Sequence, residues 1–167
     1  MNQKKTNIYT DGTYAHSHPE YHIPDSAWKA NNILKMLSKN NLSPKNICEV
    51  GCGAGEIIKV IRDKTPNDTY CYGYEISPQA FELCKTREKE RLNYFLKNFL
   101  EEEGGKCDLL LCIDVFEHVD DYLGFIRGLK GKSRYKIFHI PLDISIQSVF
   151  RETPIMDLRK NTGHLHY

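Results

Sequence analysis

The chain has 167 residues, with 23 lysines and arginines against 22 acidic residues and a formal net charge of +1. This length accommodates one sizeable hydrophobic core but not two ordinary domains. The near-neutral charge argues against a broad electrostatic field for nucleic acid or an anionic membrane. We therefore expect one domain over residues 25–167, preceded by an N-terminal arm or lid over residues 1–24, with small molecules as partners.

Membrane, disulfide and metal signals are weak in this sequence. There is no apolar run of the roughly 20 residues that a membrane-spanning helix needs and no apolar signal-peptide stretch, so a cytoplasmic protein is expected. The six cysteines form no C-x-x-C pair and are expected to be reduced, mostly buried thiols. His16, His18 and His22 have no cysteine or carboxylate partners at ligand spacing, so no metal site is predicted.

Helix-like and strand-like segments alternate along the chain. The arm has no apolar periodicity, whereas apolar residues from Ala27 to Leu37 share one face of a helix predicted over residues 26–39, with Asp25 or Ser26 as its N-cap. The next segments are a strand at 47–50, a helix at 56–64, a strand at 70–75, a helix at 78–91, strands at 93–96 and 108–114, a helix at 122–129 and a strand at 135–140. Residues 145–158 are ambiguous. This order predicts an α/β fold, a three-layer αβα sandwich around a mostly parallel sheet.

A glycine-rich turn, Glu49-Val50-Gly51-Cys52-Gly53-Ala54-Gly55, lies between a predicted strand and a predicted helix. This arrangement lets the backbone approach a ligand closely and directs the N-terminal amides of the helix at it. Glu75 stands at the end of the next strand, where a carboxylate can accept hydrogen bonds from both hydroxyls of a ribose. Together these features predict a site for a cofactor that contains a nucleoside.

A dinucleotide site, as in a nicotinamide-dependent enzyme, is an alternative for the glycine turn. It requires the spacing G-x-G-x-x-G, and its third glycine would fall at position 56, which is Glu56. A carboxylate at the start of the helix would also oppose a pyrophosphate, which needs the positive end of the helix dipole. A cofactor without phosphates therefore fits the sequence better.

The ordered set of motifs resembles the class I, Rossmann-like S-adenosylmethionine-dependent methyltransferases, in particular the group with a D-V-x-E-H segment. The resembling segments are 49–55, 72–77, 108–119, 136–141 and the G-H-x-x-x-F/Y-like stretch 163–167. The resemblance covers roughly residues 25–167. It implies a Rossmann-like fold, S-adenosylmethionine as cofactor and methyl transfer to an unidentified small-molecule acceptor. The family's seven-stranded sheet ends in an antiparallel hairpin that is missing here, so the C-terminal strands are expected to be incomplete.

The resemblance also implies individual cofactor contacts. They are Trp28, Lys29, Glu49, Gly51, Cys52, Gly53, Gly55, Glu75, Ile76, Asn98, Phe99 and Asp114. The glycine turn would surround the methionine part, Glu75 would bind the ribose and Ile76 would pack on the adenine. Asn98, where the family most often has aspartate, would meet the exocyclic amine, and Phe99 would flank the ring.

Two of these assignments have alternatives. Asp114 would lie near the methionine moiety, but a capping or loop role suits its strand-end position equally well. Trp28, the only tryptophan, would close over the cofactor with Lys29 near the cofactor's carboxylate; the alternative is an aromatic anchor that packs the first helix.

Four histidines come from the carboxyl side of the predicted sheet, where open α/β folds bind their ligands. His118 or His139 is the candidate general base for the acceptor's proton, because a neutral imidazole can accept it near physiological pH. His164 and His166 are candidate substrate contacts. For each of the four, a structural role is the alternative.

A protein that binds the cofactor without catalysis, as a regulatory module, is the main alternative to an enzyme. Loss of the final hairpin would be compatible with it. The sequence leaves open the acceptor and its reacting atom, the identity of the general base, and whether the chain is a fragment. It also leaves open the oligomeric state, although an unpaired sheet edge would favour a homodimer.

Overall fold

A computed structural model describes residues 12, 16, 23–102, 104, 106–142, 144–151 and 164–165. The strands are β1 (Asn46–Val50), β2 (Tyr70–Glu75), β3 (Leu92–Leu96), β4 (Cys107–Ile113) and β5 (Ser133–His139). The α-helices are α2 (Ile23–Lys39), α3 (Glu56–Lys64), α4 (Pro78–Lys85), α5 (Tyr122–Leu129) and α6 (Ile146–Arg151), with short 3₁₀ turns η1 (Phe99–Glu101) and η2 (Phe116–His118).

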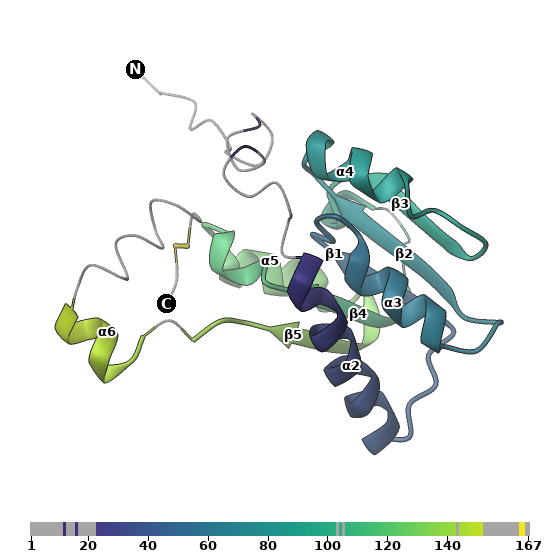
Figure 1. Cartoon of the computed structure of the whole chain (residues 1–167), viewed down its shortest axis with the longest axis horizontal. Coiled ribbons are helices and arrows are strands. Elements are labelled where there is room, and N and C mark those ends of the chain that lie inside the picture. Colours follow the sequence, from purple (N-terminus) through teal and green to yellow (C-terminus); the bar gives the residue numbers. More distant parts are fainter. Residues whose placement is uncertain are drawn as a thin grey trace.

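The five strands form one sheet in the order β3-β2-β1-β4-β5, and all four pairings are parallel. Residues of β4 alternate between two apolar clusters, because neighbouring side chains of a strand point to opposite faces. Helices α2, α3 and α4 bury their apolar faces on one side, whereas α5 and η1 cover the other. The predicted three-layer α/β sandwich with a parallel sheet is therefore confirmed (Figure 1).

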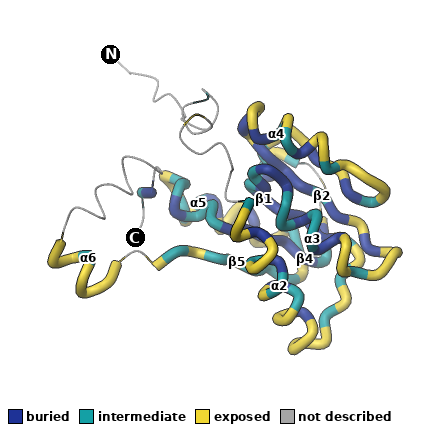
Figure 2. The backbone as a smooth tube through the Cα atoms, viewed as in Figure 1, coloured by how far each residue is buried: buried dark blue, intermediate teal, exposed yellow. Residues whose placement is uncertain are grey.

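The buried part of the described chain is concentrated in the sheet and in the inner faces of the helices, whereas α6 is exposed (Figure 2). All six cysteines are free and buried, as the sequence predicted. Within the described ranges, none of the helices combines the length and apolar character needed to cross a membrane.

Helix α2 begins earlier than the sequence indicated. It starts at Ile23, so Asp25 and Ser26 lie inside its first turn and the prediction that one of them is the N-cap was wrong. The reason is Pro24, since proline suits the first turn of a helix, where its missing N–H would have no intrahelical partner. Asp25 still contributes as an acidic residue near the positive end of the helix dipole.

Helix α4 ends at Lys85, six residues before the predicted end at Arg91, and this prediction was also wrong. The hydroxyl of Thr86 and the guanidinium of Arg87 both donate to the carbonyl of Leu83, at 2.7 and 2.8 Å. These bonds satisfy a terminal carbonyl that a longer helix would have used. The other predicted elements agree with the observed ones to within two residues, and part of the ambiguous segment 145–158 forms α6.

The order of the strands places a topological switch point at β1. The chain runs outward from β1 to β2 and β3 on one side, and then crosses to β4 and β5 on the other. Open parallel sheets bind their ligands outside the carboxyl ends of the strands at such a point. Glu49, Glu75, Asp114 and His139 all stand at or directly beyond the carboxyl ends of strands, which places them along this one edge.

Candidate active site

The turn between β1 and α3 depends on three glycines in left-handed backbone conformations. The φ angles of Gly51, Gly53 and Gly55 are 63°, 55° and 79°, a region that residues with a Cβ rarely adopt. A Cβ at Gly51 would lie 2.6 Å from Cγ2 of Val115, whereas a Cβ at Gly53 would meet no atom within 4 Å. The middle of the turn therefore faces open space.

Tyr94 of β3 supports the same turn from below. Its buried hydroxyl donates to the carbonyl of Gly55 at 2.7 Å, and its ring lies 2.5 Å from where a Cβ at Gly55 would be. Burial raises the pKa of Tyr94, so the hydroxyl keeps its proton as donor. The sequence analysis missed this residue, because only the pairing of strands brings β3 under the turn. An aromatic residue in an apolar strand gives no specific signal of this role.

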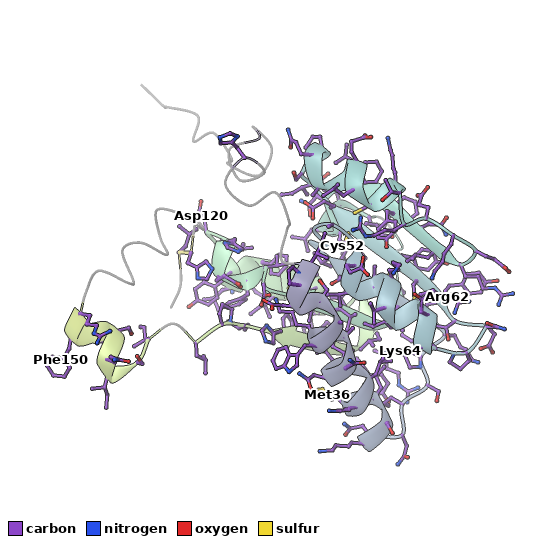
Figure 3. All side chains as sticks on the ribbon, viewed as in Figure 1. Met36, Cys52, Arg62, Lys64, Asp120 and Phe150 are labelled. Atoms are coloured by element: carbon purple, nitrogen blue, oxygen red, sulfur yellow. The ribbon has the colours of Figure 1, made fainter. Side chains whose placement is uncertain are left out.

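Cys52 contributes to the turn through its backbone. Its side chain, labelled in Figure 3, is buried, and Sγ lies 3.8 Å from Sγ of Cys84. The thiol of Cys84 in turn donates to the carbonyl of Gly53 at 3.1 Å. The amide of Cys52 donates to the carbonyl of Tyr74 at 3.1 Å, which ties the turn to β2.

Glu49 is buried at the end of β1 and faces α3. Its Oε2 accepts a hydrogen bond from the amide of Ile58 at 3.1 Å, within the first turn of that helix. Burial raises the pKa of Glu49 from its ordinary 4.5 to about 8, although the bond from Ile58 acts in the opposite direction. Glu49 thus holds the start of α3 beneath the glycine turn.

Glu75 connects the end of β2 to the glycine turn. Its Oε2 accepts from the amide of Gly53, and its Oε1 accepts from the amides of Ile76 and Ser77, each at 2.8 Å. Burial raises the pKa of Glu75, and the three backbone bonds partly oppose this shift. A carboxylate has about four acceptor positions. Oε2 therefore retains the capacity to accept one more hydrogen bond beside the open face of Gly53.

Asp114, directly after β4, contacts two polar side chains. Its Oδ2 accepts from Nζ of Lys29 on α2 at 2.6 Å, and its Oδ1 lies 2.6 Å from Nδ1 of His139 at the end of β5. Burial alone would raise the pKa of Asp114, but the bonds to Lys29 and His139 lower it overall. Asp114 is thus a charged carboxylate that links α2, β4 and β5, in place of the capping role considered above.

Trp28 lies beside this cluster. The ring is 61% exposed, so Trp28 is not a buried anchor of α2. It stands edge-on to His139 with ring centroids 6.3 Å apart. The structure therefore brings Trp28, Lys29, Asp114 and His139 together, as neighbours of the glycine turn along the same edge of the sheet.

The three residues predicted to surround the adenine occupy different environments. Ile76 is 41% exposed after β2, whereas Phe99 is 1% exposed and packs in the core with its ring centroid 4.8 Å from that of Tyr74. Asn98 caps η1, since its Oδ1 accepts from the amide of Leu100 at 3.1 Å. Of the three, Ile76 presents the most surface to a ligand.

The remaining predicted histidines form a separate group. His118 lies in η2, and its ring stands edge-on to that of His164 with centroids 5.0 Å apart. His166 falls outside the described residues, as does most of the predicted N-terminal arm, including His18 and His22. The described His16 is exposed.

Comparison with known protein families gives the chain its classification. Residues 25–166 match a family model described as a methyltransferase domain. The chain belongs to this family.

Named relatives of this methyltransferase domain include malonyl-[acyl-carrier protein] O-methyltransferase of Acetivibrio thermocellus, 30% identical over 102 residues that cover 60% of this chain and 36% of that protein. Magnesium-protoporphyrin O-methyltransferase of Synechocystis is 24% identical over 116 residues, covering 66% and 49%. The chain spans between about a third and about half of the length of the curated relatives it matches.

The solved structures support the fold of the methyltransferase domain. The crystal structure of magnesium protoporphyrin IX methyltransferase from Synechocystis with bound SAH aligns with a TM-score of 0.64 over 82% of this chain and 71% of that one, at 17% identity. The Rossmann-like fold that the sequence motifs implied is thereby confirmed.

Proposed function

We propose that this methyltransferase domain binds S-adenosylmethionine and transfers its methyl group to an oxygen of a small-molecule acceptor. One observation carries the proposal: the open face of Gly53 adjoins a buried carboxylate, Glu75, at the switch point of the sheet. Curated relatives named as O-methyltransferases support the oxygen acceptor.

The residues at this edge fit the cofactor. The space over Gly53 accepts a group that approaches the backbone closely, and the spare acceptor position of Glu75 fits a ribose hydroxyl. The exposed side chain of Ile76 would pack on the adenine, and Asp114 and Lys29 would lie near the charged methionine end. S-adenosylmethionine supplies a methyl group on a positively charged sulfur, so the protein needs to align the reactants and manage a proton.

His139 is the proposed general base. When Nδ1 of His139 donates to Asp114, Nε2 carries a lone pair that can accept a proton. Within the described residues, Nδ1 is the only ring nitrogen of His139 with a side-chain hydrogen bond. As the acceptor's oxygen bonds to the methyl carbon and the carbon–sulfur bond breaks, Nε2 would take the proton from that oxygen. Asp114 then stabilises the resulting imidazolium. His118, the other candidate, belongs to the second group of histidines.

The test is calorimetric titration of the purified chain with S-adenosylmethionine and with its demethylated product, for the unmodified protein and for Glu75→Ala and Glu75→Gln. We expect micromolar binding that Glu75→Ala weakens roughly tenfold or more, about 1.4 kcal/mol for the loss of a charge-assisted hydrogen bond. Glu75→Gln, which keeps one oxygen acceptor, should lose less. Glu82→Ala is the matched control, since Glu82 is an exposed carboxylate on α4 paired with Lys85 of the same helix.

The controls separate binding from folding. Because Glu75 accepts three backbone amides, circular dichroism and melting temperature of each variant must accompany the titrations. Absence of binding by the folded, unmodified chain, or equal affinity in folded Glu75→Ala, would overturn the proposed site. Tight binding of a nicotinamide cofactor instead would favour the dinucleotide alternative. Binding without methyl transfer to a broad panel of oxygen acceptors would favour the regulatory module.

A further inference from the structure

A second cluster of polar side chains lies on the turn after β4. Glu117 and His118 belong to η2, and His164 comes from the described end of the chain. Each offers one ligand atom, and these atoms all lie within 4.8 Å of one another. Glu117 is 1% exposed and His164 is 9% exposed, so the group is largely shielded from solvent.

Two contacts hold the segments of this cluster together. The amide of Leu165 donates to the carbonyl of Glu117 at 2.7 Å, which fixes the residue next to His164 against η2. The short yellow segment of residues 164–165 accordingly lies beside the start of α5 (Figure 1). Nε2 of His118 lies 3.9 Å from Oε1 of Glu117, and the rings of His118 and His164 meet at an interplanar angle of 72°. One carboxylate and two imidazoles thus converge from two parts of the chain.

We propose that Glu117, His118 and His164 bind a divalent transition-metal ion of the zinc or manganese class. Imidazole nitrogen with carboxylate oxygen is a ligand set that suits such ions better than calcium or magnesium, which prefer oxygen ligands alone. This inference adds a metal site to a chain whose sequence alone predicted none.

The distances between the three ligand atoms are slightly longer than a bound metal ion requires. Ligand atoms about 2.1 Å from a tetrahedral metal lie roughly 3.4 Å from one another. The three atoms here are at most 4.8 Å apart. Side-chain rotations that move these atoms by about an ångström would bring them to the separation that a tetrahedral metal needs. Three protein ligands leave at least one coordination position for water or another oxygen, as in open metal sites.

The experiment measures metal binding alone, on the full chain after treatment with a chelator. Calorimetry with zinc chloride and with manganese chloride should give one ion per chain. Glu117→Gln and His164→Ala should each weaken the binding of the preferred ion at least tenfold. His16→Ala is the matched control, since His16 is an exposed histidine outside the cluster and should leave the affinity unchanged.

Cobalt substitution identifies the ligands. The cobalt form should show the visible bands of nitrogen and oxygen ligation without the thiolate charge-transfer band that binding to one of the six cysteines would produce. A thiolate band, or full affinity in His164→Ala, would overturn the proposal. If Glu117→Gln fails to fold, His164→Ala still decides, because His164 lies outside the described helices and strands. No cofactor is present in this experiment, so its outcome is independent of the proposed methyl transfer.

Discussion

Asp114 shows how one residue can combine an unusual backbone with several charged contacts. It has a φ of 54°, in the left-handed region that non-glycine residues seldom occupy, and its carboxylate meets Lys29 and His139 at 2.6 Å each. Such strained positions persist where the surrounding structure fixes them, and they concentrate at functional sites. Its amide also donates to the carbonyl of His139 at 3.0 Å. The backbone and the side chain of Asp114 therefore both orient His139.

We predict that His139→Gln lowers the rate of methyl transfer on the order of 100-fold or more, the usual contribution of a general base. The affinity for S-adenosylmethionine should change less than about threefold, because the proposed role concerns the acceptor's proton. Single-turnover transfer to an acceptor found by screening, with calorimetry alongside, measures both quantities. His16→Gln is the control. An unchanged single-turnover rate in His139→Gln would exclude this residue as the base.

The turn between β1 and α3 is the element on which the cofactor proposal depends. Its three glycines share left-handed backbones, but their surroundings differ. Gly51 packs against Val115 and Gly55 against Tyr94, whereas Gly53 faces open space. The first two glycines are therefore required by packing as well as by backbone conformation, and Gly53 is the position where room remains.

We predict different consequences for Gly51→Ala and Gly53→Ala. Both should lose roughly 1–2 kcal/mol of unfolding free energy from the left-handed backbone, and Gly51→Ala should lose about 1–3 kcal/mol more because its methyl group would overlap Val115. Gly53→Ala should weaken S-adenosylmethionine binding tenfold or more despite its smaller loss of stability. Urea unfolding and calorimetry measure the two effects. Full affinity in Gly53→Ala would mean that the space above Gly53 is not used by the cofactor.

The stability of the whole molecule is linked to the ionisation of Glu49. Its pKa is raised to about 8 in the folded chain, chiefly by burial, against an ordinary value of 4.5. As the pH rises above 4.5 the unfolded chain releases this proton while the folded chain retains it. The stabilising contribution is therefore fully present below about pH 4.5 and is lost as the pH rises to about 8.

We predict that Glu49→Gln gains stability relative to the unmodified protein as the pH rises from 4.5 to 8, and that the difference becomes constant above pH 8. The slope should approach, at most, about 1.4 kcal/mol per pH unit, the value for one proton. Urea unfolding at several pH values measures it. Glu82→Gln, at an exposed site, should follow the unmodified protein. Parallel curves for Glu49→Gln and the unmodified chain would contradict the raised pKa.

Much of this architecture follows from local sequence patterns. Apolar periodicity located the sheet strands and most helix ends, because burial of one face imposes a repeat on the sequence. The glycine turn and Glu75 were identifiable because a tight strand-to-helix turn needs residues without Cβ, and because the end of the second strand has a fixed place beside it. The early end of α4 was missed because side-chain bonds to Leu83 decide it, and no periodicity encodes them.

Only the tertiary structure decided which of these residues meet. Lys29 lies 85 positions before Asp114, and His139 lies 25 positions after it, yet all three join in one hydrogen-bonded group. Tyr94 reaches Gly55 across 39 positions in the same way. A sequence pattern specifies which face of an element is buried, whereas contacts between distant segments depend on strand order and on the packing of helices over the sheet. The sequence by itself therefore determined the fold class and the glycine-rich turn, and the packing determined the group around Asp114.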